Sequence, residues 1–333
     1  MLLLWGIMKI NCLGWYNRGN VGDEAFKLAH KELFPPCEAV YTSEELKPGV
    51  TILGGGDVIK SYYLNVIPPE HPYYALGVGL GYESETDLIG KNLKMGFFRN
   101  KKDVLLANEK GIPALYTPDL TFVIEAPLQS QSILSKLKMT TIKKTIGVFL
   151  SDCLNPTLGR EMHGEASYGE FFKWELAKCL EYLQEWYEII FIPMSHELYS
   201  YDVRIHADVL CRMGQVKNDK LIVKPFSAAE TIKLISELDL VIGMKYHSII
   251  FATLVGTPFV NIGLTRKTEL FCEEEGLSKF SIPKYGFLKE RFLQTVKEAE
   301  ADGVEEELLQ VTTNKKRQLK EVKSYIQEEW FKI

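Results

Sequence analysis

The sequence predicts an α/β protein made of two doubly wound domains that face a central cleft. Short apolar runs of strand type alternate with longer segments of helical spacing from end to end, which is typical of parallel sheets covered by helices on both faces. At 333 residues the chain exceeds one ordinary core and favours two domains of similar size. A polar segment between Ala126 and Lys144 separates two series of strands. We therefore expect an N-terminal domain over residues 1–130, a linker over 131–144, a C-terminal domain over 145–312, and a helix over 313–333 that packs back on the body.

The order of the elements follows from the apolar runs and the turn signals between them. In the first half, strands are expected at 9–13, 39–41, 50–53, 74–78, 95–98 and 114–116, with helices notably at 22–33 and 101–110. In the second half, strands are expected at 145–150, 188–193, 221–223, 238–243 and 259–262, and helices at 168–186, 202–213, 228–237, 266–275 and from residue 246 up to Gly256. Near the end, Leu319, Val322, Ile326 and Trp330 make one apolar helical stripe.

Composition excludes several classes of protein. A net charge of −5 without a long basic stripe argues against a nucleic-acid binder. The six cysteines form no CxxC pair, so neither a zinc site nor a disulfide scaffold is predicted, and a reducing compartment fits. The apolar residues 1–7 lack a basic region and a cleavage site and are too short to cross a bilayer. We expect a cytoplasmic protein without a membrane span, and its oligomeric state stays open.

The segment Gly243–Ala252 places an imidazole and an ammonium group where a strand turns into a helix. The first turn of that helix offers free backbone N–H groups and a positive dipole end beside Lys245 and His247, an arrangement that holds an anion. The alternative is that His247 and Ser248 only cap the helix. Arg266 and Lys267 follow the next strand and complete a cationic pocket in an acidic protein, which suits a small, multiply charged anion.

Two glycine-rich loops follow strands of the N-terminal domain. Gly14–Ala25 opens a helix, but its glycines lack the GxGxxG spacing, so a nicotinamide dinucleotide is disfavoured. Gly54–Asp57 lacks the ending of a nucleoside-triphosphate loop. Both loops could approach a sugar or phosphate, or could be capped turns in which Asn20, Asp23 or Asp57 bonds the helix.

Further polar side chains follow other strands. Arg99 ends a strand and its guanidinium could pair with a carboxylate or phosphate, although an arginine at such a position is usually solvated; Asp119 is a similar case. His196 follows the strand at 188–193 and is a candidate ligand contact. Arg160 and His163 lie in a long loop after the first strand of the second domain. The remaining histidines, His30, His71 and His206, are expected to be structural.

With these motifs in place, the chain resembles the polysaccharide pyruvyltransferases over nearly its whole length. The resemblance rests on the Asn-x-Gly-Asn-x-Gly-Asp core of Gly14–Ala25, on Gly54–Asp57, Arg99 and Asp119, and above all on Gly-Met-x-x-His-Ser-x-x-Phe-Ala with a later Gly-x-Pro-x-Val. Two positions depart from the family pattern. Lys245 stands where arginine is common, and Asn100 and Asp103 follow Arg99 where an acidic residue and a serine are common.

The resemblance implies a GT-B-like fold of two Rossmann-like domains, with phosphoenolpyruvate held by the C-terminal domain and a sugar by the N-terminal one. It implies transfer of pyruvate to two hydroxyls of the sugar as a cyclic ketal, with release of phosphate, in the synthesis of cell-surface polysaccharide. The implied catalytic residues are His247, Arg99 and Lys267, and the implied donor contacts are Lys245, Ser248, Arg266 and His196. The implied acceptor contacts are Asn17, Gly19, Asn20, Gly22, Asp23, Gly55, Gly56, Asp57 and Asp119.

No metal or cofactor is expected beyond the donor substrate, because fixed cations and helix N–H groups can meet the developing charge. The acceptor could be a free, nucleotide-linked or lipid-linked sugar or glycan, and a lipid-linked acceptor would bring the protein to the inner face of the membrane. Two other functions stay open at this point. One is a glycosyltransferase of the same architecture that uses a sugar nucleotide, and the other is an inactive sugar-binding relative.

Overall fold

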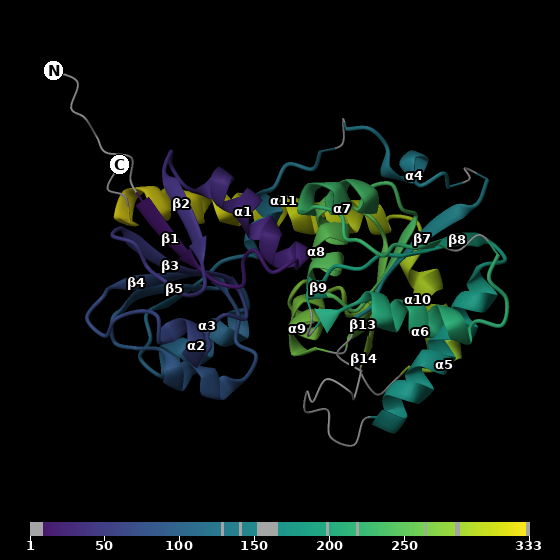
Figure 1. Cartoon of the computed structure of the whole chain (residues 1–333), viewed down its shortest axis with the longest axis horizontal. Helices are drawn as coiled ribbons and strands as arrows, with labels where there is room; N and C mark the ends of the chain where they lie inside the picture. Colours follow the sequence, from purple (N-terminus) through teal and green to yellow (C-terminus); the bar gives the residue numbers. More distant parts are fainter. Residues whose placement is uncertain are drawn as a thin grey trace. The chain divides into compact units, whose positions relative to one another are not determined.

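The computed structural model describes residues 9–127, 130–139, 142–151, 166–197, 200–217, 220–263, 265–283 and 287–330. Arg160, His163 and residues 1–7 lie outside these ranges. The chain divides into two compact units, shown in Figure 1. The first unit comprises Met1–Arg18, Asp23–Ile124 and Thr313–Ile333, and the second unit comprises Gly19–Gly22 and Glu125–Thr312.

The first unit is built on a parallel sheet in the order β2-β1-β3-β4-β5-β6. Its elements are β1 (Lys9–Leu13), α1 (Val21–Leu33), β2 (Glu38–Thr42), β3 (Val50–Gly56), α2 (Ser61–Leu64), β4 (Tyr73–Val78), the 3-10 helix η1 (Glu83–Leu88), β5 (Leu93–Phe98), α3 (Lys101–Glu109), β6 (Ala114–Tyr116) and η2 (Leu120–Val123). Alternate residues of the strands face opposite sides of the sheet, so each side needs its own cover.

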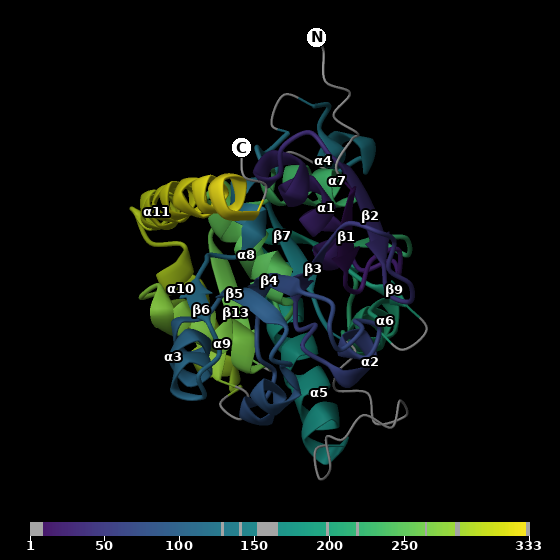
Figure 2. The same ribbon diagram turned by 90° about the vertical axis from the view of Figure 1, so that its left-hand side faces the viewer.

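One face of this sheet is covered by α2 and α3, through a core that includes Leu53, Tyr63, Phe98 and Ala107. The end of the chain packs on the opposite face, where Trp330 stacks on Tyr74 with ring centroids 4.2 Å apart. In Figure 2, helix α11 (Val304–Tyr325) lies above strands β4 and β5, and α3 lies below them. The apolar stripe of the last helix therefore packs within the first unit, and the structure begins that helix at Val304, upstream of the predicted 313.

The second unit has a parallel sheet in the order β11-β8-β7-β12-β13-β14. Its elements are α4 (Ile133–Lys136), β7 (Lys144–Phe149), α5 (Ala166–Leu183), β8 (Tyr187–Phe191), the short antiparallel pair β9 (His196–Glu197) and β10 (Ser200–Tyr201), α6 (Val203–Arg212), β11 (Lys220–Leu221), α7 (Ala228–Ile235), β12 (Leu240–Gly243), α8 (Tyr246–Val255), β13 (Phe259–Gly263), α9 (Arg266–Glu274), η5 (Ser278–Phe280), β14 (Ser281–Pro283), α10 (Lys289–Ala299) and the first part of α11; the π-helical turn η6 (Ile326–Trp330) closes the described chain in the first unit.

Helices cover both faces of this second sheet as well. The chain leaves β7 toward β8 but leaves β12 toward β13, so right-handed crossovers place α5 and α8 on opposite faces. Helix α5 contacts α6 and α10 on its face, whereas α8 contacts α7 and α9. The predicted fold class of two doubly wound parallel α/β units is thereby confirmed.

Two details of the expected element order were wrong. Gly54, Gly55 and Gly56 are part of strand β3 and do not follow it. Gly55 has a positive φ of 68°, and Phe26 of α1 packs where its side chain would begin. No strand was predicted after residue 262, yet β14 adds the edge strand and α10 covers it.

Candidate functional site

The topology of each sheet determines where a ligand site can form. In an open parallel sheet, the carboxyl ends of two neighbouring strands whose connections diverge leave a crevice. In the second sheet those strands are β7 and β12, and in the first they are β1 and β3. Lys245 lies in the loop after β12 and His247 in the first turn of α8, while the loop after β1 begins the Gly14–Ala25 motif and Asp57 follows β3. Each unit thus places a predicted motif at its own switch point.

The turn from β12 into α8 is tight and internally bonded. The hydroxyl of Ser248 donates to the carbonyl oxygen of Lys245 at 2.6 Å, and a Cβ on Gly243 would lie 2.4 Å from that hydroxyl oxygen. Gly256, with a φ of 79°, ends the helix in the left-handed region. Ser248 therefore uses its proton on the backbone, and the turn directs the N-terminus of α8 to the carboxyl edge of the sheet.

Lys245 is the N-cap residue of α8 and forms an ion pair with a carboxylate that the sequence did not single out. Its Nζ lies 2.8 Å from Oδ1 of Asp202, whose side chain is 0% exposed. The other oxygen of Asp202 accepts from the backbone N–H of Met194 at 3.1 Å, so the carboxylate joins the end of β8 to the start of α8. Burial raises the pKa of Asp202, and the ammonium of Lys245 opposes that rise. The positive charge expected from Lys245 is thus partly balanced inside the unit.

His247 packs directly against the glycine of the first motif. A Cβ added to Gly22 would lie 2.1 Å from Nδ1 of His247 and 2.7 Å from its Cγ, so only glycine leaves room for the imidazole. The N–H of Gly22 donates to Oδ1 of Asn20 at 3.0 Å, which makes Asn20 the capping side chain of α1. Two motifs more than 200 residues apart in the chain are therefore complementary in shape.

The residues before Gly22 pair with the loop after β8. The N–H of Val21 donates to the carbonyl of Met194 at 2.8 Å, and the N–H of His196 donates to the carbonyl of Gly19 at 3.2 Å. Nε2 of His196 is buried without a hydrogen-bond partner among the described residues. Burial, with a smaller contribution from Lys224, lowers the pKa of His196. Gly19, Asn20 and Gly22 were expected as acceptor contacts of the N-terminal domain, and the structure groups them with His196 and His247 in the second unit.

Two further cations stand at the start of α9. Arg266 and Lys267 are its first residues and follow the strand next to β12, so they share the carboxyl edge with His247. Both are half-buried. The hydroxyl of Thr268 donates to the carbonyl of Thr265 at 3.0 Å and holds the first turn of the helix.

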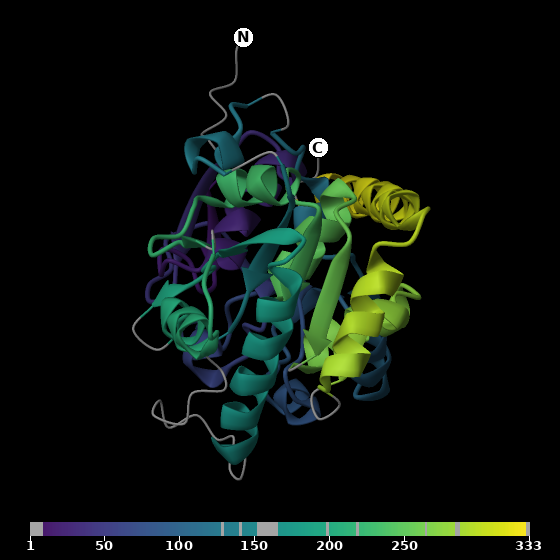
Figure 3. The same ribbon diagram turned by 90° about the vertical axis from the view of Figure 1, so that its right-hand side faces the viewer.

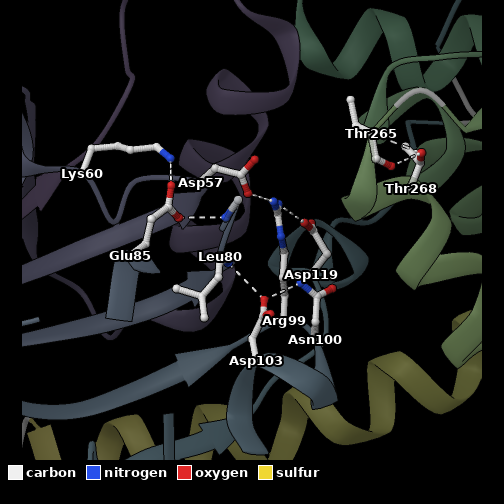
Figure 4. Close-up of polar contacts among 11 residues, drawn as sticks. Asp57, Lys60, Leu80, Glu85, Arg99, Asn100, Asp103, Asp119, Thr265 and Thr268 are labelled. Atoms are coloured by element: carbon white, nitrogen blue, oxygen red, sulfur yellow. Dashed lines mark hydrogen bonds and ion pairs between the residues drawn. The ribbon is translucent and has the colours of Figure 1, made fainter. Parts of the chain in front are cut away.

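In the first unit, the predicted residues Arg99, Asp57 and Asp119 form one cluster (Figure 4). Nη2 of Arg99 lies 2.5 Å from Oδ1 of Asp57, and its Nη1 lies 3.5 Å from Oδ2 of Asp119. The side chains of Arg99 and Asp119 are each 1% exposed, in contrast to the solvated position usual for an arginine at a strand end. Gly79 at the end of β4 makes the contact with Asp57 possible, because a Cβ there would lie 2.8 Å from Nε of Arg99. Asp57 is thus an ion-pair partner, and Lys60 is the N-cap of the following helix.

The residues after Arg99, which depart from the family pattern, support this cluster. Oδ2 of the fully buried Asp103 accepts from the side chain of Asn100 at 2.7 Å and from the backbone N–H of Leu80 at 3.0 Å. Glu85 accepts from the N–H of Gly81 at 2.8 Å and also pairs with Lys60 (Figure 4). The loops after β3, β4 and β5 are therefore tied together at the carboxyl edge.

The other predicted acceptor contacts have local structural partners. Asn17, at a φ of 61°, donates its N–H to Glu24 at 2.6 Å and accepts from Lys27 at 2.7 Å. Oδ1 of Asp23 lies beside Gly56, where a Cβ would be 3.4 Å away. Asp119 also accepts from the hydroxyl of Thr121 at 2.6 Å. The geometry places these groups, and their roles toward an acceptor stay predictions.

Among the described residues, no group of three or more His, Cys, Asp or Glu side chains is arranged to hold a metal ion. In the same part of the chain, no helix combines the length and the apolar character needed to cross a membrane.

Comparison with solved structures defines the class of fold. The chain is similar to the S. aureus MnaA-UDP co-structure, with a TM-score of 0.66, 12% identity and 98% of each chain covered. It is similar to UDP-GlcNAc 2-epimerase from Neisseria meningitidis bound to UDP-GlcNAc, with a TM-score of 0.63, 13% identity, and 97% of this chain and 100% of that chain covered. It is also similar to Anabaena Alr3699/HepE in complex with UDP-glucose, with a TM-score of 0.64, 11% identity, and 98% of this chain and 100% of that chain covered. These neighbours confirm the GT-B-like fold.

No curated protein matches the chain by sequence. The polysaccharide pyruvyl transferase family matches residues 25–265, which is more than half of the chain. The protein therefore belongs to the polysaccharide pyruvyl transferase family, as its motifs indicated.

Proposed function

We propose that the protein transfers pyruvate from phosphoenolpyruvate to two hydroxyls of a sugar or glycan acceptor, forming a cyclic ketal and releasing phosphate. The observation that carries the proposal is the turn Gly243–Ser248 at the switch point of the second sheet, in a chain of this family. Backbone N–H groups of a helix N-terminus and several cations stand at one sheet edge there, which suits a ligand with a phosphate and a carboxylate.

The chemistry assigned to this edge begins with the donor. The phosphate of phosphoenolpyruvate would bind at the N-terminus of α8, and Lys245, Arg266 and Lys267 would meet its charges. Ser248 would hold the turn through its bond to the Lys245 carbonyl. His196 would contact the donor through Nε2, which has no hydrogen-bond partner among the described residues.

His247 is the proposed general acid. It would deliver a proton to the methylene carbon of phosphoenolpyruvate, so that C2 becomes electrophilic and one sugar hydroxyl adds to it. The bond from C2 to the phosphate oxygen then breaks, and the second hydroxyl closes the ketal. One hydroxyl proton replaces the proton given to the methylene carbon, and the other leaves with phosphate. Near-neutral titration of imidazole suits this role and also the stabilisation of departing phosphate.

Asp23, Asp57 and Asp119 are the proposed acceptor-side carboxylates. They belong to the first unit, and Asp57 and Asp119 share Arg99 as a partner. Arg99 fixes the positions of Asp57 and Asp119 and, in the proposal, supplies positive charge to the reaction. The scheme uses no metal ion, so transfer is expected to continue in excess chelator.

The deciding experiment incubates the protein with phosphoenolpyruvate and a panel of free, nucleotide-linked and lipid-linked sugars. Phosphate release that depends on acceptor, with a product heavier by the mass of a pyruvate ketal, supports the proposal. Release of nucleotide from a UDP-sugar instead would assign a glycosyltransferase, and acceptor binding without turnover of any donor would assign an inactive relative. His247→Ala should abolish the phosphate release and keep the far-ultraviolet circular dichroism of the parent.

A further inference from the structure

The second unit contains a pocket that is separate from the proposed transfer site. It has a volume of about 410 Å³ and is lined by Lys144, Tyr182, Leu183, Trp186, Tyr187, Leu293, Val296, Lys297 and Glu300. Lys144 is the first residue of β7 and Tyr187 the first of β8. Because the strands are parallel, this end of the sheet is opposite the carboxyl edge that carries Lys245 and His247. Figure 3 views the side of this unit where α5, in teal, and α10, in yellow-green, run.

The end of α5 and the turn that follows it expose two large aromatic rings, Tyr182 and Trp186. Tyr182 is 45% exposed and Trp186 is 54% exposed, and their ring centroids lie 4.9 Å apart in an edge-to-face arrangement. Leu183 and Val296 beside them are buried. Aromatic rings of this size usually gain stability by burial, so a pair held at the mouth of a pocket offers flat apolar surface to a ligand. A sugar ring fits such a surface with the face that carries its C–H bonds.

The polar part of the pocket combines donors and acceptors. Nζ of Lys144 lies 2.9 Å from Oε1 of Glu300. Burial, and then a hydrogen bond with Glu300, raise the pKa of Tyr187. Lys297 lies one turn before Glu300 on α10, and Nζ of Lys289 is 5.1 Å from the centre of the Tyr182 ring. The mixture of signs selects among ligands. These charged groups would oppose burial of an acyl chain, whereas vicinal hydroxyls can donate to the carboxylate and accept from the ammonium groups.

We propose that this pocket between α5 and α10 binds a saccharide unit of a glycan, at a second site outside the transfer site. The proposal rests on the proposed function to the extent that the acceptor is a glycan. A unit held here would retain a polymer on the protein independently of the donor. The volume of the pocket lies in the lower part of the roughly 300–1,000 Å³ range typical of small-ligand sites.

The test measures binding in the absence of phosphoenolpyruvate, so its outcome does not depend on turnover. The probes are defined oligosaccharides of glucose, galactose, mannose, N-acetylglucosamine and glucuronic acid, four to six units long. Saturation-transfer NMR and calorimetry measure their binding. We expect at least one to bind the full-length protein and Trp186→Ala to weaken that binding at least tenfold. Trp174→Ala is the matched control, because Trp174 is 50% exposed on α5, which precedes Trp186, but does not line the pocket.

A second variant separates recognition from folding. Glu300→Gln keeps the size of the side chain and should weaken saccharide binding several-fold, while the thermal midpoint stays close to that of the parent. His247→Ala should bind the same saccharide as the parent, even if the proposed transfer reaction fails. The proposal is overturned if no saccharide binds, if Trp186→Ala and Trp174→Ala weaken binding equally, or if anionic phospholipid vesicles bind in place of saccharides and both tryptophan variants lose that binding.

Discussion

The ammonium of Lys245 lies 2.8 Å from the carboxylate of Asp202, so the cation next to the family's histidine is held by a buried anion. Lys245 begins the helix that carries His247, whereas Asp202 precedes α6. The pair both neutralises charge and positions the turn. Separating these two effects is possible because an amide at 202 keeps the shape and removes only the charge.

Asp202→Asn should lower stability and at the same time strengthen donor binding. Loss of one partner from a largely buried ion pair costs about 3 kcal/mol in the free energy of unfolding. The variant also leaves one more uncompensated positive charge near the donor, so KM for phosphoenolpyruvate should fall several-fold at pH 8. Denaturant unfolding and phosphate-release kinetics measure the two effects.

The pH dependence of KM is the control for Asp202→Asn, because it separates the effect of charge from that of position. Burial raises the pKa of Asp202, so the wild-type carboxylate takes up a proton as pH falls and then resembles the amide. The ratio of the two KM values should therefore approach one toward low pH. A KM that rises in the variant at every pH would show that the pair acts by position alone.

Gly22→Ala should reduce activity through His247. A Cβ at this position would lie 2.1 Å from Nδ1, so the imidazole has to move, and overpacking of this kind costs about 1–3 kcal/mol of stability. Turnover should fall at least a hundredfold, because general acids depend on geometry.

A double-mutant cycle tests that explanation. In His247→Ala the ring is gone, so the added methyl group of Gly22→Ala has room and should cost little. The unfolding free energies should then be non-additive, with a coupling of about 1–3 kcal/mol. Additive losses would mean that the glycine is needed for its own backbone conformation.

The sequence predicted strand positions better than it predicted the tertiary contacts around the strands. Strands such as β1 and β6 were predicted with their observed bounds, because continuous apolar runs between turn residues are local signals. Gly54–Gly56 was read as a turn since glycine usually interrupts strands, yet Tyr16 donates to the Gly54 carbonyl and Phe26 fills the space beside Gly55. These contacts arise from the tertiary structure and leave no pattern in the local sequence.

The same distinction applies to the candidate site. His247, Lys245 and Arg99 stood out because they follow strands, and the strand order then showed which loops are neighbours. Asp202 was missed, since an aspartate before a helix ordinarily caps it in solvent, and only the fold reveals that its side chain is buried against Lys245. The sequence offered one hint, the spacing of Val203, His206 and Val209 on one side of the helix. The structure buries all three, so this end of α6 is interior.

Replacement of Arg99 should be more costly than replacement of either carboxylate. Arg99→Ala leaves Asp57 and Asp119 without the charge between them, and a broken buried pair costs about 3–5 kcal/mol. Asp57→Asn should cost less than Asp119→Asn, because the side chain of Asp57 is 27% exposed and that of Asp119 is 1% exposed. Urea unfolding measures the order, and a cheaper Asp119→Asn would contradict the assigned geometry.

Two buried histidines should make the protein sensitive to acid. Burial lowers the pKa of both His30 and His206 to about 3, with Lys245 adding to the effect at His206, whereas an unfolded histidine titrates near pH 6.5. The stability that the neutral rings contribute is fully present above about pH 6.5 and is lost as pH falls toward 3, because only the unfolded state takes up the protons. Each ring can add up to about 1.4 kcal/mol per pH unit to that slope.

Single replacements should divide the acid slope between the two sites. Nε2 of His206 accepts from the N–H of Leu150 at 2.9 Å, so His206→Gln can keep an acceptor while removing the titration. His30 lies between Phe34 and Tyr41 with ring centroids 4.7 and 5.9 Å away, and His30→Leu keeps an apolar side chain there. Each variant should flatten the plot of unfolding free energy against pH between 6.5 and 4, and the double variant should flatten it further. An unchanged slope in the double variant would show that other groups cause the loss in acid.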